Sequence, residues 1–221
     1  MDPQTVIARR VAQELRPGML VNLGIGIPTL VANYVPRDMQ VFFQSENGLI
    51  GTGPIPEQGM VGRFLTDAAG KPVSALPGAA TFDSAMSFGL IRGGHVDMTV
   101  LGALEVDEQG HIANWTIPGR LVPGMGGAMD LVSGAKRVVV AMQHTAKGRS
   151  KLVERCSLPL TSQRAVDLVV TELAVISFAT GRAVLLETAP DVSVQDVLAA
   201  TDGRLTVPEQ VGRMAIGEGG P

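Results

Sequence analysis

Three short apolar runs narrow the folds open to this chain more than any other feature. They are "MLVNL" (19–23), "QVFFQ" (40–44) and "RVVVAM" (137–142), and each has the length of a buried strand. Residues 2–18, before the first run, begin with an Asp-Pro pair and end near a Pro-Gly pair, which predicts a helix. Strands that alternate with helices predict an α/β fold, in which a mostly parallel sheet is covered by helices.

The rest of the chain adds further elements to the same fold. We expect loops over 51–80, hairpins at "DEQG" (107–110) and across Thr180-Gly181, and helices at about 163–171 and about 193–200. Another helix is predicted after a cap at Thr81, with an apolar face made of Phe82, Ala85, Met86, Gly89 and Leu90. The pattern predicts a single domain over residues 1–221, with a poorly ordered tail over about 203–221.

Charge and hydropathy argue against several classes of partner. The net charge is −3, the pI is about 5.6 and no long basic block occurs, so the sequence indicates no nucleic-acid partner. No run of about 18 uncharged apolar residues exists, so we expect no membrane span. Cys156 is the single cysteine, and the first ten residues lack the apolar core of a signal peptide. These features predict a reducing compartment, the cytoplasm.

Familiar catalytic motifs are incomplete in this sequence. "GIGIPT" (24–29) lacks the third glycine of a dinucleotide-binding loop, and in "GMGGAMD" (124–130) Met129 stands in that place. Ser87 in "AMSFG" approximates the nucleophile motif of serine hydrolases, but it lies in a helical pattern rather than at a strand-to-helix turn. Cys156 and His144 are a candidate Cys-His pair, and a buried cysteine without chemistry is the simpler interpretation. The three histidines lack metal-ligand spacing, so we expect no metal.

One carboxylate stands directly after an apolar run, in "VFFQSENGLIGTGP" (41–54). In the simpler interpretation, Glu46 is a solvated residue of an Asn-Gly turn. In the other, it lies at the mouth of a site, because open α/β sheets bind ligands beyond the carboxyl ends of their strands. A glutamate is ionised at neutral pH and attacks an activated acyl group, such as a thioester, without a separate base. Backbone N–H groups of the glycine-rich loops at the strand ends, and the amide of Asn22, are candidate oxyanion donors.

Five segments taken together resemble the B (β) subunit of family I coenzyme A transferases, the 3-oxoacid CoA-transferases. The similarity extends over about residues 4–205 and includes the acetate/butyrate–acetoacetate type. It implies the α/β fold of that subunit, with glycine-rich loops at the strand ends. The segments are "NLGIGIP" (22–28), "QSENGLIGTGP" (44–54), "LPGAATFDSAMSFGLIRGGH" (76–95), "ANWTIPG" (113–119) and "GMGGAMDLV" (124–132).

The resemblance implies a role for each candidate site residue. The glutamate of the S-E-N-G motif is the covalent nucleophile of the family, which here is Glu46. Asn22 is implied to lie beside it, and the amides of Gly127 and Ala128 are implied to help form an oxyanion or acyl pocket. A ping-pong reaction follows, through a glutamyl-CoA thioester and without a permanently bound cofactor or a metal. Further candidate positions in the site loops are Gly24, Gly26, Asn47, Gly48 and Gly126.

The same resemblance implies which molecules the chain meets. The substrates are a short-chain acyl-CoA and a 3-oxoacid such as acetoacetate, so the CoA thioester is a substrate and not a cofactor. An α (A) subunit is the implied protein partner, in an α2β2 assembly. Succinyl-CoA:3-oxoacid and 3-oxoadipate transferases fit the same motifs. Two other hypotheses stay open: an acyl-CoA hydrolase on the same scaffold and a non-catalytic scaffold subunit.

Overall fold

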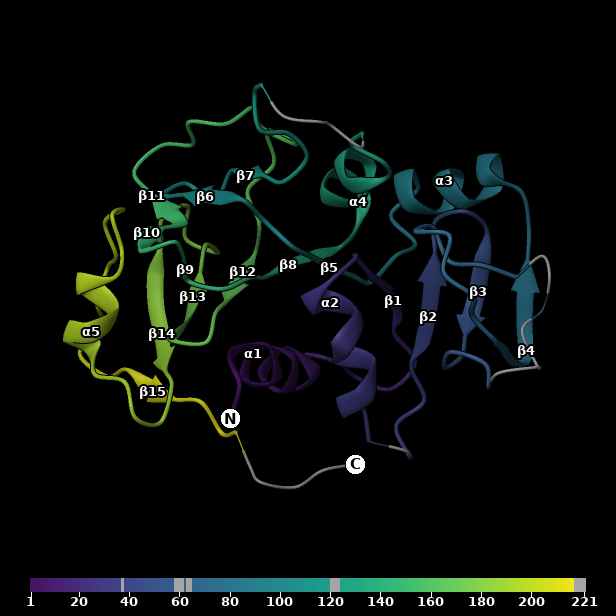
Figure 1. Ribbon diagram of the computed structural model, residues 1–221, viewed down its shortest axis with the longest axis horizontal. Helices are drawn as coiled ribbons and strands as arrows, with labels where there is room; N and C mark the ends of the chain where they lie inside the picture. The colour runs from purple at the N-terminus through teal and green to yellow at the C-terminus, as the bar shows by residue number, and fades with distance from the viewer. Residues whose placement is uncertain (37, 58–61, 63–64, 120–123, 217–221) are drawn as a thin grey trace.

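A ten-stranded sheet forms the centre of the computed structural model, which describes residues 1–36, 38–57, 62, 65–119 and 124–216 (Figure 1). Its five central strands are parallel, and antiparallel pairs flank them on both sides, with one parallel pair at an edge. The predicted mostly parallel central sheet is therefore confirmed. In spatial order the strands are β15 (Gly212–Arg213), β14 (Val184–Thr188), β13 (Ala174–Ser177), β12 (Leu168–Val170), β8 (Arg137–Ala141), β5 (Met98–Leu101), β1 (Leu20–Leu23), β2 (Phe42–Ser45), β3 (Leu49–Thr52) and β4 (Ala75–Thr81).

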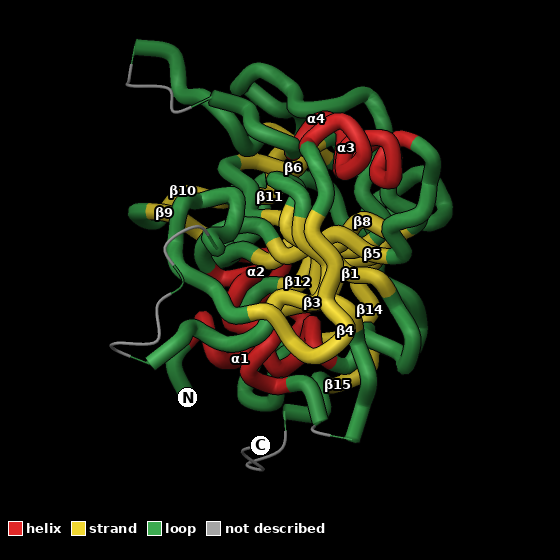
Figure 2. Tube along the Cα trace, turned by 90° about the vertical axis from the view of Figure 1, so that its right-hand side faces the viewer, coloured by secondary structure: helices red, strands yellow, loops and turns green. Residues whose placement is uncertain are grey.

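Helices cover both faces of this sheet. The helices are α1 (Pro3–Ala12), α2 (Ile27–Leu30), the 3-10 helix η1 (Val31–Tyr34), α3 (Ser84–Arg92), α4 (Ala128–Gly134) and α5 (Val194–Ala199). Figures 1 and 2 show α3 and α4 on one face and α1 and α2 on the other. Two small sheets complete the fold, β10 (Arg149–Ser150) with β9 (Thr145–Ala146), and β11 (Leu152–Val153) with β6 (Glu105–Asp107) and β7 (Ile112–Ala113). Among the described residues, no helix has the length and apolar character needed to cross a bilayer.

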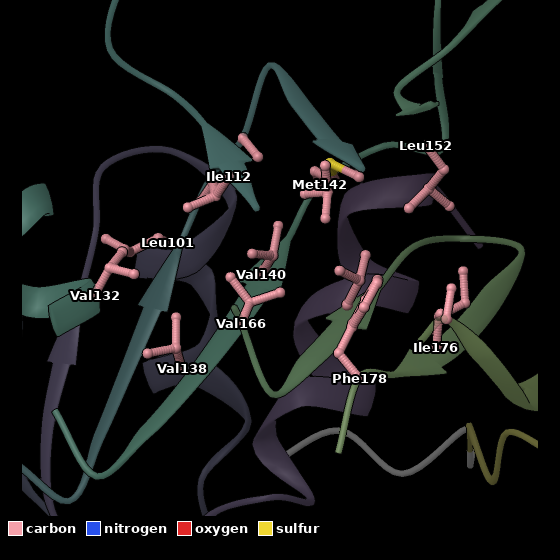
Figure 3. Close-up of a cluster of buried hydrophobic side chains, with 14 of the residues drawn as sticks. Leu101, Ile112, Val132, Val138, Val140, Met142, Leu152, Val166, Ile176 and Phe178 are labelled. Atoms are coloured by element: carbon pink, nitrogen blue, oxygen red, sulfur yellow. The ribbon is translucent and has the colours of Figure 1, made fainter. Parts of the chain in front are cut away.

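Alternate side chains of β8 pack into two hydrophobic cores, one on each face of the sheet. Val138 and Val140 pack in the cluster that α3 and α4 cover, part of which Figure 3 shows. Val139 and Ala141 point to the opposite cluster, with Ile7 of α1. Burial of one aliphatic side chain is worth about 1.5–3 kcal/mol, so both faces of the central strands contribute to stability. The two cores therefore lie on opposite faces of one sheet.

Several predicted elements are confirmed at close to their predicted bounds. The apolar runs at 19–23, 40–44 and 137–142 correspond to β1, β2 and β8. The carboxylate of Asp2 accepts the N–H of Thr5 at 3.1 Å and so caps α1. The hairpin at 107–110 joins β6 to β7, and the hairpin across Thr180-Gly181 joins β13 to β14.

Other predictions are wrong. The predicted helix at about 163–171 is instead a turn followed by β12, because three buried apolar residues pair with β8 on one side and β13 on the other. The segment predicted as loops contains the end of β3 and most of β4, and its residues 58–61 and 63–64 lie outside the described residues. β4 escapes the pattern because it is an exposed edge strand, the position where a strand tolerates proline and glycine.

The helix predicted after Thr81 exists as α3, but its cap and its buried face differ from the prediction. Asp83, rather than Thr81, caps the helix by accepting the N–H of Met86 at 2.8 Å. Ser87 and Ile91 are buried against the sheet, whereas Met86 of the predicted apolar face is 59% exposed. The predicted apolar face is therefore exposed at Ala85, Met86 and Gly89, and the face that meets the sheet carries polar Ser87 together with apolar Ile91.

Part of the predicted tail belongs to the fold. β15 pairs with β14 through Gly212 and Arg213, and Met214 is buried in the core that contains α1. The structure thus pairs a segment for which the sequence predicted poor order, and residues 217–221 of that tail lie outside the described residues. The pairing of β15 could not be predicted from the sequence, because a strand of two residues has no detectable hydrophobic periodicity.

Candidate functional site

Glu46 is the first residue after β2, at the carboxyl end of a central parallel strand. β2 turns directly into antiparallel β3, and the N–H of Gly48 closes the turn by donating to the Ser45 carbonyl at 3.0 Å. Gly48 has φ of +122°, a conformation that residues with a Cβ rarely adopt. The tight turn holds Glu46 half-buried at the rim of the sheet instead of releasing it into a loop.

Asn22 lies beside Glu46 on the neighbouring strand β1. Its side chain is 1% exposed, and its Nδ2 atom donates to Glu46 Oε2 at 3.1 Å. The same nitrogen also donates to Gln44 Oε1 at 2.8 Å. β1 and β2 are in register with Asn22 opposite Gln44, which fixes how far each side chain lies from the rim. The structure therefore brings together two residues that the sequence placed at the ends of separate strands.

Gly127 closes the site from the entrance to α4. It is buried, and a Cβ added at this position would lie 3.1 Å from Glu46 Cγ and 3.4 Å from Glu46 Oε1. Only the absence of a side chain lets the backbone approach the carboxylate so closely. The neighbouring N–H of Ala128 donates to the Met125 carbonyl at 3.3 Å, a long hydrogen bond within the turn before α4. Gly127 thus contacts Glu46, while the Ala128 amide is engaged in the turn.

The other candidate loop positions have different local roles. Asn47 is exposed and its side chain donates to the Thr66 carbonyl at 2.8 Å, so it braces a neighbouring loop. Gly24 donates its N–H to the Val100 carbonyl at 2.8 Å, which ties the loop after β1 to β5. Gly26 and Gly126 are exposed and have φ of +89° and +56°, so they serve as turn residues.

A small cavity opens at the same edge of the sheet. Its volume is about 160 Å³, and it lies where β1, β5 and β8 end. Its walls are Ile25, Ile27, Pro28, Gly102, Ala103, Ala141, Met142, Gln143, Thr145, Ala146 and Lys151. Ligand pockets for drug-sized molecules measure about 300–1,000 Å³, so this cavity accepts a small molecule or one end of a larger one.

The alternative catalytic residues do not form sites in the described structure. Ser87 lies within α3 and is fully buried, so no strand-to-helix turn presents it. Cys156 donates to the His111 carbonyl at 3.5 Å, and burial raises the pKa of its thiol to about 12, so it is a poor nucleophile. Within the described residues, no group of three or more histidine, cysteine, aspartate or glutamate residues is arranged to hold a metal ion.

His144 is a buried structural residue. Its Nδ1 lies 3.0 Å from Thr171 Oγ1, its Nε2 lies 2.9 Å from Thr201 Oγ1, and the ring is 0% exposed. Thr201 Oγ1 donates to the Val197 carbonyl at 2.7 Å, and Thr171 Oγ1 donates to the Ala174 carbonyl at 3.2 Å. Both ring nitrogens therefore lie against hydroxyl groups that the backbone holds in place. Burial lowers the pKa of His144 from 6.5 to about 4.

This buried histidine predicts an acid-sensitive stability. Below pH 6.5 the unfolded chain binds a proton at His144, whereas the folded chain leaves His144 neutral until about pH 4. The free energy of unfolding therefore falls as the pH drops toward 4. At about 1.4 kcal/mol per pKa unit, we expect a loss of about 3 kcal/mol. Denaturant unfolding at several pH values between 4 and 7 measures it. His144→Gln should flatten the dependence, whereas His95→Gln, at an exposed ring, should retain it. Equal slopes in both variants would contradict this assignment.

The polar neighbours of Asn22 on the strands, Gln44 and Thr99, were missed from the sequence. Both are buried, at 3% and 0% exposure, in strands that otherwise read as apolar. The available signal was a polar residue in the middle of a buried run, which needs a partner when the strand is covered on both faces. The identity of that partner depends on strand order, which the sequence pattern does not specify.

Comparison with known proteins places these residues in a family. The coenzyme A transferase family matches residues 5–200 of the chain. The chain is 54% identical over 208 residues to the beta subunit of the acetate CoA-transferase of Escherichia coli K12, covering 94% of this chain and 95% of that one. It is 49% identical over 202 residues to the B subunit of the succinyl-CoA:3-ketoacid coenzyme A transferase of Helicobacter pylori strain 26695, covering 91% and 97%.

A solved structure shares the fold. The apoenzyme of the acyl-CoA transferase YdiF from Escherichia coli O157:H7 superposes with a TM-score of 0.77 over 96% of this chain, at 23% sequence identity. The chain corresponds to 43% of that longer chain. At this identity the likeness shows that the architecture is common to both proteins.

Proposed function

The chain belongs to the coenzyme A transferase family, as a B-type subunit, and we propose that Glu46 is its covalent nucleophile in moving CoA between a short-chain acyl-CoA and a 3-oxoacid such as acetoacetate. The observation that carries this proposal is the position of Glu46, half-buried between the Asn22 amide and the backbone of Gly127. The Glu46 carboxylate accepts an N–H of Asn22 and lies close to the backbone of Gly127. The turn closed by Ser45 and Gly48 fixes its position. These are the features that a nucleophile at a strand end requires.

The reaction proceeds by two exchanges at the Glu46 carboxylate. A carboxylate oxygen attacks the thioester carbonyl and forms an acyl-glutamyl anhydride, and the CoA thiolate leaves with the electron pair of the C–S bond. The thiolate then attacks the glutamyl carbonyl, which forms a glutamyl-CoA thioester and releases the first carboxylic acid as its anion. A second carboxylate reverses both steps and leaves as the new acyl-CoA. One thioester is exchanged for another, so the steps balance without ATP or redox chemistry.

The residues around Glu46 act on the charge that develops in these steps. Each attack produces an oxyanion, and removal of one donor from such a site costs about 10²–10³-fold in rate. Asn22 Nδ2 already lies 3.1 Å from Glu46 Oε2, so we assign it to the glutamyl oxygen. We assign the Gly127 N–H, with that of Ala128 once its long bond to Met125 opens, to the acyl or oxyanion pocket.

The partners follow from the relatives. Each of the two relatives described above is one subunit of its enzyme, of the beta or B type, so we propose that this chain works with a separate α (A) subunit, as α2β2. Their names also support the substrate class, acetate in one and a 3-ketoacid with succinyl-CoA in the other. CoA is a substrate in this scheme, and no permanently bound cofactor is proposed. The single cysteine supports the prediction of a cytoplasmic location.

Covalent trapping tests the proposed function. The chain, purified together with its α subunit, is incubated with acetoacetyl-CoA and then reduced with borohydride, which converts a glutamyl thioester to an alcohol. Peptide mass spectrometry should find the mass decrease on the peptide that contains Glu46 and on no other glutamate peptide. Omission of acyl-CoA is the control and should leave Glu46 intact. An unmodified Glu46 in a complex that turns over acyl-CoA would refute the assignment. Trapping accompanied by net hydrolysis would indicate an acyl-CoA hydrolase.

A further inference from the structure

A row of polar side chains crosses the sheet face that α3 and α4 cover. Gln44 of β2, Asn22 of β1 and Thr99 of β5 are register partners on three adjacent parallel strands. The next partner in the row is Val138 of β8, which belongs to the hydrophobic cluster on the same face. A buried polar group costs free energy unless it is hydrogen-bonded, so three such groups in an apolar layer must satisfy one another or a neighbour.

Hydrogen bonds connect this row to α3 at one end and to Glu46 at the other. Gln44 Nε2 donates to Ser87 Oγ at 3.0 Å, and Ser87 is 0% exposed. Asn22 Nδ2 donates to Gln44 Oε1 at 2.8 Å and to Glu46 Oε2 at 3.1 Å, and it lies 3.3 Å from the Gln44 backbone carbonyl. On the far side, Thr99 Oγ1 lies 3.5 Å from Asn22 Oδ1, a long contact at best. A continuous path therefore leads from Ser87 through two carboxamides to Glu46.

The two carboxamides are coupled in orientation. A carboxamide has an acceptor on one side and a donor on the other, so turning Gln44 over would set its N–H group against that of Asn22. Turning both over would set Asn22 Oδ1 against the Glu46 carboxylate, where two partial or full negative charges repel. The observed orientations satisfy Ser87, Asn22 and Glu46 together. We infer that Gln44, anchored by Ser87, is a positioning residue that holds the Asn22 N–H toward Glu46.

This role explains why Ser87, a polar residue, is buried against the sheet while apolar Met86 of the same helix is exposed. Because the role rests on the proposed function of Glu46, its effect falls on the chemical steps. Asn22 must meet the Glu46 carboxylate before attack and the glutamyl oxygen afterwards, within a small positional tolerance. A misplacement of about 1 Å can cost about 10²-fold in rate, so a carboxamide that is free to rotate is a measurable defect.

Gln44→Met tests the inference, because methionine keeps the length and shape but removes both hydrogen-bonding groups. In the complex with the α subunit, we expect kcat to fall by about 10–10²-fold, with KM for acyl-CoA within about twofold. A defect in kcat with an unchanged KM separates loss of positioning at Glu46 from loss of acyl-CoA binding. Ser87→Ala should lower kcat in the same way with a smaller loss of about 3–10-fold, since the bond between Gln44 and Asn22 remains.

The control is Thr161→Val, which removes another buried hydroxyl, hydrogen-bonded to Asn114 and outside the row. It should lower stability and leave kcat and KM unchanged. The inference is overturned if Gln44→Met, or Ser87→Ala should Gln44→Met not fold, keeps the wild-type kcat. The wild-type complex reports separately on the proposed function. A thioester on Glu46 with an unaltered kcat in Gln44→Met rejects the positioning role alone, whereas absence of the thioester rejects both.

Discussion

Replacement of Glu46 with alanine is expected to abolish CoA transfer by the assembled enzyme. Loss of a covalent nucleophile typically costs about 10⁴–10⁶-fold in kcat, because no neighbouring group can form the intermediate. Asn22 is the side chain hydrogen-bonded to Glu46, and its neutral amide is not a nucleophile under these conditions. Steady-state transfer from acetoacetyl-CoA to acetate, measured with the α subunit present, gives the result directly.

The aspartate variant separates the presence of a carboxylate from its position. Glu46→Asp keeps the charge but withdraws it by more than about 1 Å, so we expect a loss of about 10²-fold or more. Glu154→Ala, which removes an exposed glutamate far along the chain, should stay within about twofold of wild type. If Glu46→Ala retained wild-type activity in the reconstituted complex, the chain would be a scaffold subunit and the catalytic group would lie elsewhere.

Gly48→Ala is expected to be the most destabilising single methyl addition near the site. The new Cβ would lie 2.0 Å from the Phe82 carbonyl oxygen, and φ of +122° adds backbone strain. Strain of this kind costs about 1–3 kcal/mol and overpacking about as much again, so we expect a loss of about 3–5 kcal/mol. For a chain of this size that corresponds to a fall in Tm of about 10 °C or more, which calorimetry measures.

Gly70→Ala is the matched control for this effect. Gly70 also has a positive φ, +77°, but an added Cβ there meets nothing within 4 Å. It should therefore show the strain alone, about 1 kcal/mol. Equal losses in the two variants would mean that the turn between β2 and β3 moves aside easily. In that case the geometry of the turn would not hold Glu46 in place.

The sequence predicted the parts of this site that local rules govern. Asn22 lies at the end of one recognisable apolar run and Glu46 directly follows another, and the rule for open α/β sheets places such residues at one edge. Their contact at 3.1 Å agrees with that expectation. Gln44 and Ser87 were not predicted as partners, because their hydrogen bond spans 43 residues and depends on which face of α3 meets the sheet.

The misassigned elements failed for identifiable physical reasons. The sequence pattern predicts the apolar stripe of α3 as its buried face, whereas the structure exposes Met86 at 59%. Residues 168–170 were assigned to a helix because a short apolar run fits either period, and only their place between β8 and β13 makes them a strand. In both cases tertiary contacts outweighed the local pattern.

The order of strands across the sheet also sets when the site comes into existence. Asn22 meets Gln44 across 22 residues but meets Thr99 across 77, and Gly127 enters later still. Parallel strands cannot pair through a tight hairpin. The chain must therefore lose the entropy of closing a long loop before the stabilising contacts between those strands form. During vectorial synthesis, Asn22, Gln44 and Glu46 are all made before Gly127 and α4. A nascent chain therefore contains the Glu46 carboxylate before its neighbours are complete. Gly127 reaches Glu46 only after α4 has been synthesised.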